Sequence, residues 1–329
     1  MQSQTRTITE HSRSADLEPE KVRIAVTLPT FRRPDHLIAT LNSLEALNAG
    51  EETAVIVMDN DADGLEGAAA AEKWLQSSRL KGLVVVAHQR GNCHAYNAGW
   101  QTALETFAGL EHVAVIDDDE LATPGWLERL RETARRTGAD LVGGPQIPVF
   151  ADPSLERWRA HPVFKPHYDT SGPVPILYSS GNVLISRAVL DAMPRPFLDP
   201  AFNFIGGGDS DFYRRARAKG FGFAWCTEAA VMETLPSRRT EFSWVNARSL
   251  RNGAISAIIE KRQWPGIKGR LRRMGKSVAL LLASPVRGVR MWARTGSAVA
   301  GLYHLQVAVG RLMAEAGLVN EQYRNPESN

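Results

Sequence analysis

Short β-branched apolar runs alternate with helical patterns over the first 145 residues of the chain. The apolar runs span 22–28, 54–58, 83–87 and 112–116, and each is long enough for a buried strand. Leucines at helical spacing predict a helix that begins at Pro34 and ends before Gly50. Further helices are predicted at 65–78, 93–108 and 123–138, and Thr123 is the expected N-cap of the last. Continuous apolar strands separated by helices predict an α/β fold with a mainly parallel, Rossmann-like sheet covered by helices on both faces.

Composition supports a folded protein with more than one domain. The 329 residues are 43% hydrophobic and 23% charged, which excludes a mostly disordered chain. Two cysteines, Cys93 and Cys226, are too few for a disulfide framework. The net charge of +3 is unevenly distributed, because residues 261–329 carry 12 Lys/Arg and 3 Glu whereas residues 1–260 carry a net −6. A basic tail on an acidic body raises an anionic membrane or nucleic acid as a partner.

The two ends of the chain give expectations about location. Residues 1–20 lack the apolar core of a signal peptide and are predicted to be a disordered leader. The sequence contains no run of 18 apolar residues, so no clear spanning helix is expected. We therefore expect a cytoplasmic protein.

The later part of the chain is less regular. Residues 145–178 read as a long functional loop or an inserted subdomain. A strand is expected within 178–186, a helix at 210–219, strands near 221–225 and 229–232, and a helix at 241–260.

Acidic side chains follow two of the predicted strands. Asp59 follows the strand predicted at 54–58, and Asp117-Asp118-Asp119-Glu120 follows the strand predicted at 112–116. Pro29 and Thr30 follow the strand predicted at 22–28. Ligands of such sheets collect at the carboxyl ends of the strands. Asp117 and Asp119 can face one ligand, and carboxylate oxygens suit Mg²⁺ or Mn²⁺ together with substrate phosphates. The alternative is a solvated acidic loop that caps the next helix.

A second acidic cluster follows the glycines 206–208. Asp209 stands at the start of a predicted helix, where the helix dipole keeps a carboxylate ionised, as a general base requires. The same pattern is also typical of a simple N-cap after a glycine turn. The local sequence leaves both interpretations open.

Five motifs in order resemble the glycosyltransferase family 2 enzymes, which have a GT-A fold. They are VTLPTFRRPDHL, VIVMDNDAD, RGNCHAYNAG, VAVIDDDE and GGGDSDFYRRARAKGFGFAWCTEA, and they cover about residues 22–232. The following VMETLPSRRTEFSWVNARSLRNG looks like bacterial exopolysaccharide glucosyltransferases of the succinoglycan ExoM type. The resemblance implies a GT-A domain over 21–260, with a nucleotide-sugar half at 21–145 and an acceptor half at 146–260.

The resemblance also implies roles for single residues. Thr30 and Asp59 would line the base and ribose site, Asp117 would contact the nucleotide, and Asp119 would bind Mn²⁺ or Mg²⁺ at the donor diphosphate. Asp209 would deprotonate the acceptor hydroxyl in an inverting, single displacement. The remaining donor-site residues by this comparison are Pro29, Asp118 and Arg239.

The chain departs from the common family pattern in three places. Tyr96 replaces the arginine of an ARN motif, Gly208 replaces a glutamate before the base, and Glu233 stands where many relatives have a late histidine. The last change leaves the third metal ligand open. Arg239, beside Arg238, is either a diphosphate contact, since guanidinium groups bind phosphate well, or part of a solvated basic pair.

The tail at 261–329 is expected to form basic amphipathic helices. Residues 261–294 contain ten Lys/Arg and no acidic residue, and Pro285 is expected to break this stretch into two helices. Basic amphipathic helices with Trp and Leu favour an anionic bilayer surface. Nucleic acid and an intramolecular solvated face compete with this interpretation; we expect no nucleic acid, because no recognised binding module is present.

Together these features predict a metal-dependent glycosyltransferase on the cytoplasmic face of the inner membrane. It would move a sugar from a nucleotide-sugar donor, such as a UDP-sugar, to a lipid-linked saccharide or polysaccharide in cell-surface polysaccharide synthesis. One alternative is a sugar-nucleotide pyrophosphorylase, although the segment after the first strand lacks the glycine-rich signature of that class. Another is a non-catalytic, membrane-associated protein that binds nucleotide sugars.

Overall fold

The computed structural model describes residues 7–322 and 324, which divide into two compact units. The first unit comprises residues 7–147, 167–203 and 208–233. The second comprises residues 148–166, 204–207 and the described chain from 234 onward. The second unit therefore takes in residues that we placed in the acceptor half, and its helical part begins well before Lys261.

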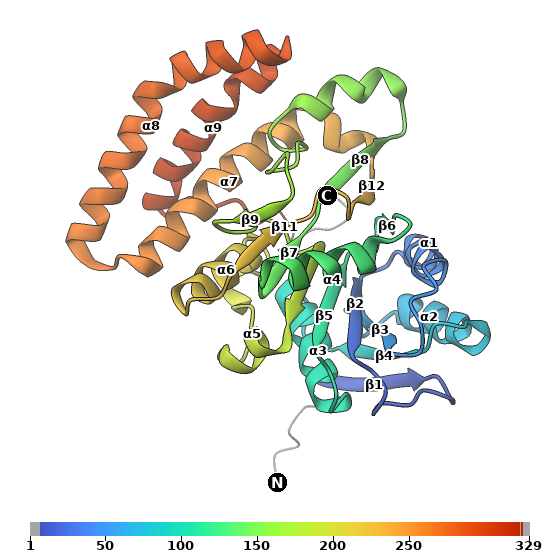
Figure 1. Ribbon diagram of the computed structural model, residues 1–329. Helices are drawn as coiled ribbons and strands as arrows, with labels where there is room; N and C mark the ends of the chain where they lie inside the picture. The colour runs from blue at the N-terminus through green and yellow to red at the C-terminus, as the bar shows by residue number, and fades with distance from the viewer. Residues whose placement is uncertain (1–6, 323, 325–329) are drawn as a thin grey trace. The chain divides into compact units, whose positions relative to one another are not determined.

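The first unit is built on a nine-stranded sheet (Figure 1). Its order is β1-β4-β3-β2-β5-β10-β7-β11-β9. Within the described residues, six strands (β2, β3, β4, β5, β7 and β11) run in one direction and β1, β9 and β10 oppose them. The expected mainly parallel sheet is confirmed. The strands are β1 (Ile8–Arg13), β2 (Ile24–Thr30), β3 (Thr53–Asp59), β4 (Gly82–Ala87), β5 (His112–Ile116), β7 (Leu141–Gly143), β9 (Gly172–Val174), β10 (Asn182–Ser186) and β11 (Phe223–Trp225).

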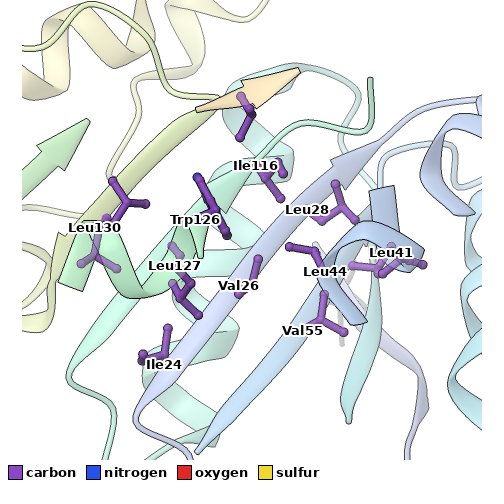
Figure 2. Packing of buried hydrophobic residues seen from close by; sticks show 14 of the residues in the cluster. Ile24, Val26, Leu28, Leu41, Leu44, Val55, Ile116, Trp126, Leu127 and Leu130 are labelled. Atoms are coloured by element: carbon purple, nitrogen blue, oxygen red, sulfur yellow. The ribbon is translucent and has the colours of Figure 1, made fainter. Parts of the chain in front are cut away.

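Helices cover the sheet because its central strands are apolar on both faces. In β2, Ile24, Val26 and Leu28 share one core with Leu41 and Leu44 of α1 and with Trp126, Leu127 and Leu130 of α4, as Figure 2 shows. The alternate residues of β2 point the other way, and α3 packs on β2 and β3. The helices of this unit are α1 (Pro34–Glu45), α2 (Glu66–Ser77), α3 (Asn92–Thr106), α4 (Trp126–Thr137), α5 (Arg187–Ala192) and α6 (Gly208–Ala218), with a 3₁₀ turn η2 (Pro200–Phe202).

The predicted disordered leader is wrong for its described part. Ile8–Arg13 forms β1, which pairs antiparallel with β4 at the edge of the sheet. Thr9 Oγ1 also lies 2.9 Å from His88 Nε2. A polar strand can occupy an edge because backbone hydrogen bonds hold it there and charged side chains discourage further pairing. Residues 1–6 of the expected leader lie outside the described residues.

The helix expected from Thr123 begins later, at Trp126. Residues Glu120–Ala122 form β6, which pairs with β12 (Val231–Leu235), and β8 (Gln146–Phe150) completes this three-stranded sheet. Thr123 Oγ1 donates to the carbonyl oxygen of Ala230, the residue before β12, at 2.7 Å, so this hydroxyl does not cap α4. Gly125 precedes α4 with φ of 76°.

The second unit is dominated by three long helices, which Figure 1 shows beside one another. Its elements are η1 (Pro153–Ala160), η3 (Ser237–Thr240), α7 (Phe242–Gln263), α8 (Gly266–Thr295) and α9 (Ala298–Glu315). A Cβ at Gly253 of α7 would lie 2.1 Å from Val307 O of α9, and a Cβ at Gly310 of α9 would lie 1.9 Å from Leu250 O of α7. Glycine at both positions lets the two backbones touch.

The expected break at Pro285 is wrong, because α8 continues through it. Proline has no N–H to donate to the carbonyl of Leu281 one turn earlier. Ser284 Oγ donates to that same oxygen at 2.7 Å. The carbonyl that proline leaves unbonded is therefore satisfied within the helix.

Candidate active site

The site is centred on the acidic turn Asp117–Glu120, directly after the buried strand β5. The turn is closed from within: Glu120 N donates to Asp117 O at 3.2 Å, and Asp117 N donates to Glu120 Oε2 at 2.9 Å. Glu120 itself is fully buried. The alternative of a solvated acidic loop is therefore not what the fold forms, since Asp118 and Glu120 of the turn are buried.

Thr30 and Arg33, from the end of β2 and the start of α1, hold the middle of this turn. Thr30 Oγ1 donates to Asp118 Oδ2 at 2.9 Å. Arg33 Nη1 donates to Asp118 Oδ1 at 3.3 Å and to Asp119 Oδ2 at 3.2 Å. Burial raises the pKa of Asp118 to about 6, although the charge of Arg33 opposes this shift. Arg33 thus supplies positive charge to these carboxylates. The sequence motif VTLPTFRRPDHL contains Arg33, but it assigned no role to this residue.

Tyr96 of α3 supplies the contact to Asp117. The tyrosine is fully buried, and its hydroxyl donates to Asp117 Oδ1 in a short hydrogen bond. Burial, followed by the charge of Asp119, raises the pKa of Asp117 in spite of this bond. The group that contacts this carboxylate is therefore a neutral phenol.

A polar network supports the turn from behind. Glu120 Oε1 accepts from Gln146 Nε2, and Gln146 Oε1 accepts from the hydroxyl of Ser179, both in short hydrogen bonds. The carbonyl of Ser179 accepts from Tyr213 OH at 2.7 Å. Burial raises the pKa of Glu120 well above its ordinary value. The network joins segments distant in sequence, which is why sequence analysis missed Gln146, Ser179 and Tyr213.

Gly181 lies against the same carboxylates. A Cβ at this position would be 2.6 Å from Glu120 Oε1 and from Gln146 Nε2, and 2.8 Å from Asp117 Oδ2. We expect Gly181→Ala to displace these groups, to lower the free energy of unfolding by about 1–3 kcal/mol and to reduce any activity that depends on this site. Denaturant unfolding and initial rates measure the two effects.

Gly275→Ala is the matched control for this substitution. Gly275 lies within α8, and a Cβ there would meet no atom within 4 Å. Alanine should stabilise this position by up to about 1 kcal/mol. Equal stability and equal rates for Gly181→Ala and the wild type would contradict the packing described above.

Asp209 is the second residue of α6 and is partly exposed. A Cβ at Gly208 would lie 2.8 Å from Cys93 Sγ, so α6 begins directly against α3. Burial, and then the charge of Asp209, raises the pKa of Cys93 to about 12, which excludes this thiol as a nucleophile.

Tyr213 connects Asp209 with the acidic turn. Its pKa is raised well above the ordinary value by burial, and next by the charges of Asp209 and of Asp117. Both carboxylates therefore act on one buried phenol. The first unit thus brings Thr30, Asp117, Asp118, Asp119 and Asp209 to one region of the carboxyl edge of the sheet.

Two other predicted donor-site residues lie at the ends of β2 and β3. Asp59 is fully buried; its carboxylate accepts from Asp61 N at 2.9 Å and from Ala68 N at 2.7 Å. Burial nevertheless raises the pKa of Asp59. Pro29 is buried within β2, opposite Met58 of β3. In this structure Asp59 joins β3 to the start of α2, and its contact with a nucleotide stays a prediction.

Glu233 belongs to the first unit and Arg239 to the second. Glu233 is in β12, in register with Glu120 of β6, and its charge raises the pKa of Asp117 and Glu120. Arg239 belongs to the second unit, where its guanidinium lies 5.8 Å from the ring centroid of Trp244. A role for Arg239 at a diphosphate stays a prediction.

No group of three or more His, Cys, Asp or Glu side chains within residues 7–322 is arranged to hold a metal ion by itself. Mg²⁺ and Mn²⁺ commonly combine one or two carboxylates with substrate phosphates and water. The crowding of Asp117, Asp118 and Asp119, and the raised pKa values of the first two, fit a site that gains from added positive charge.

A mainly parallel sheet with an acidic turn at its carboxyl edge is typical of α/β enzymes, which bind their ligands at this edge. Comparison of the sequence with protein families is more specific. The chain belongs to the glycosyl transferase family 2, whose sequence profile matches residues 25–193. It is 32% identical over 238 residues to the succinoglycan biosynthesis protein ExoM of Rhizobium meliloti (strain 1021), covering 71% of this chain and 74% of ExoM. The protein is therefore a glycosyltransferase, as the sequence motifs predicted.

Solved structures confirm the GT-A fold. The mannosyltransferase PcManGT from Pyrobaculum calidifontis, in complex with GDP-Man and Mn²⁺, matches with a TM-score of 0.58 at 16% identity over 90% of each chain. S. aureus TarS 1-349 in complex with UDP matches with a TM-score of 0.52 at 14% identity, over 90% of this chain and 92% of TarS.

Proposed function

We propose that this glycosyltransferase moves a sugar, with inversion, from a nucleotide-sugar donor to a lipid-linked saccharide or polysaccharide acceptor in cell-surface polysaccharide synthesis. The observation that carries the proposal is the convergence of two carboxylate groups within the first unit. In this proposal the turn Asp117–Asp119 binds the donor and Asp209 acts on the acceptor; the charges of Asp209 and Asp117 both act on the buried Tyr213, which supports a shared site.

In this proposal the donor occupies the carboxyl edge of the sheet. Pro29, Thr30 and Asp59 line the nucleoside site, and Asp117 and Asp118 contact the nucleotide. Arg239 assists the diphosphate. Asp118 is held by Thr30 and Arg33, so the turn is ordered before the donor arrives.

Asp119 is the proposed ligand of the divalent cation, Mn²⁺ or Mg²⁺, with Glu233 as a candidate further ligand. The cation would neutralise charge on the departing nucleoside diphosphate. Arg33 contacts Asp119 through one amino group at 3.2 Å and keeps this carboxylate oriented within the turn.

Asp209 is the proposed general base. Its place in the first turn of α6 lets the helix dipole stabilise the ionised carboxylate, which accepts the proton of the attacking hydroxyl. A single base on the side opposite the leaving group is what an inverting displacement requires. A covalent route would need a second carboxylate as nucleophile.

The relatives support the substrate classes in the proposal. ExoM is a succinoglycan biosynthesis protein, which supports a polysaccharide product. PcManGT was solved in complex with GDP-Man and Mn²⁺ and TarS in complex with UDP, which supports a nucleotide-sugar donor and a divalent cation. We propose UDP as the carrier and the cytoplasmic face of the inner membrane as the location.

A donor panel tests this function. Full-length protein is incubated with single nucleotide sugars, Mn²⁺ or Mg²⁺ and membrane extract as acceptor, and nucleoside diphosphate release is followed. Release that depends on donor, acceptor and cation is expected. Pyrophosphate release from a nucleoside triphosphate and a sugar phosphate would instead indicate a pyrophosphorylase. Donor binding without release for every donor would indicate a non-catalytic binding protein.

A further inference from the structure

Helix α8 is unusual in the second unit because its apolar face points outward. The residues that it buries are Gly269, Arg273, Ser277 and Ser284. The exposed fractions of Ile267, Leu271 and Leu282 are 68%, 66% and 75%. The outer stripe of α8 is defined by the exposed residues Ile267, Leu271, Val278, Leu282, Val286, Val289 and Trp292.

Polar contacts explain why the inner face of α8 needs no large apolar side chains. Arg311 of α9 is 1% exposed, and it donates to Ser277 Oγ at 3.1 Å and to Glu260 of α7 at 2.6 Å. Arg273 forms an ion pair with Glu315 of α9. These bonds hold the three helices together through charged and small residues. The seven residues of the outer stripe take no part in these contacts and stay exposed.

The spacing of the outer stripe makes it one continuous surface. Its residues follow one another at intervals of three, four or seven positions, which keeps them on one side of an α-helix. From Ile267 to Trp292 the stripe is about 37 Å long. A contiguous exposed apolar surface of this kind marks an interaction site.

Charge identifies the occupant of this surface. Lys268, Arg270, Arg272, Lys276, Arg287, Arg290 and Arg294 belong to α8, which contains no acidic residue. Lys261, Arg262 and Arg270 also line a hollow of about 750 Å³ at the junction of α7 and α8, next to Ile267. Cations beside an apolar stripe complement phosphate head groups beside acyl chains. No helix within the described part of the chain is long and apolar enough to cross a bilayer.

We propose that the outer stripe of α8 lies in the surface of an anionic bilayer. Leu271 and Leu282 then enter the acyl region, and the flanking arginines contact the lipid phosphates. The hollow at the junction of α7 and α8 holds a lipid head group. This inference rests on the proposed function in one respect: an enzyme bound to the bilayer surface would be able to reach a lipid-linked acceptor. Vesicle binding is measured without sugar transfer, so either proposal can fail while the other stands.

Co-sedimentation with vesicles tests the proposal on the full chain. Wild type should bind vesicles of phosphatidylcholine mixed with phosphatidylglycerol, and bind much less to phosphatidylcholine alone. Leu271→Ser/Leu282→Ser should weaken binding by about tenfold or more. Arg290→Gln/Arg294→Gln should weaken it by about tenfold on anionic vesicles only. The charge-matched control Arg136→Gln/Lys219→Gln, at exposed positions of the first unit, should bind as wild type.

A labelled cysteine gives a second measurement that does not depend on folding defects. Cys93 and Cys226 are both buried, so an environment-sensitive dye will react with an introduced Leu282→Cys and not with the native thiols. Its emission should shift to the blue on anionic vesicles, whereas the same dye at Arg136→Cys should not respond.

Four results would overturn the proposal. The first two are vesicle binding by Leu271→Ser/Leu282→Ser at the wild-type level and an unchanged emission from the dye at position 282. The third is a dimer in light scattering that the stripe substitutions dissociate while vesicle binding persists. The fourth is preferential binding to nucleic acid through the same arginines, without vesicle binding.

Discussion

Asp209→Asn should reduce sugar transfer by about 1,000-fold while leaving donor binding intact. Asparagine preserves the size of the side chain but cannot accept the proton of the acceptor hydroxyl, and a positioned general base contributes about 10²–10⁴-fold to a rate. Asp209 is partly exposed, so its neutralisation should change the free energy of unfolding little. Initial rates with a saturating donor, together with calorimetric donor binding, measure the two expectations.

Asp211→Asn is the matched control on the same helix. Asp211 is buried, and its carboxylate forms an ion pair with Arg215 at 2.8 Å. Loss of this pair should lower the free energy of unfolding by about 1–2 kcal/mol, since Arg215 remains partly hydrated. Transfer by the folded variant should persist. Equal losses of donor binding and transfer in Asp209→Asn would show that Asp209 is structural and would remove the proposed base.

Asp119→Asn should abolish the dependence of donor binding on Mn²⁺ and lower transfer by more than about 100-fold. The substitution replaces a carboxylate, which binds Mg²⁺ or Mn²⁺ well, with a neutral amide. Arg33 keeps its second partner Asp118, so the turn should stay folded. Donor binding titrated with Mn²⁺ measures the effect, and chelation of the cation should reduce wild-type activity to the level of the variant.

Asp63→Asn provides the same charge change at an exposed position after β3, and it should behave as wild type. If Asp119→Asn keeps full cation dependence, then Asp119 is not the metal ligand. If wild type transfers sugar at full rate after chelation, then the proposed cation dependence itself is wrong.

The sheet could be predicted because each of its elements is specified by a short stretch of sequence. The strands around Val26, Val57, Val85 and Val115 are continuous apolar runs. Each helix between them has apolar residues at helical spacing and residues that end the helix. Parallel order then places the ends of these strands at one edge, so the acidic turn Asp117–Glu120 could be assigned to a site without coordinates.

The partners of that turn could not be predicted, because no local pattern specifies them. Arg33, Tyr96, Gln146, Gly181 and Tyr213 come from separate elements and meet only after the sheet has formed. The edge strand β1 was missed for a related reason. It is held by backbone hydrogen bonds to β4, which any polar sequence can make.

The sequence by itself determined that the C-terminal region would be basic, helical and apolar in part, since those properties are carried by residue types and their spacing. Only the tertiary structure decided which face of α8 is buried. Arg311, Glu260 and Ser277 satisfy one another inside the helical unit, whereas Leu271 and Leu282 stay exposed on α8. Buried charges are stable only when they are paired, and their pairing depends on three helices that no single stretch of sequence describes.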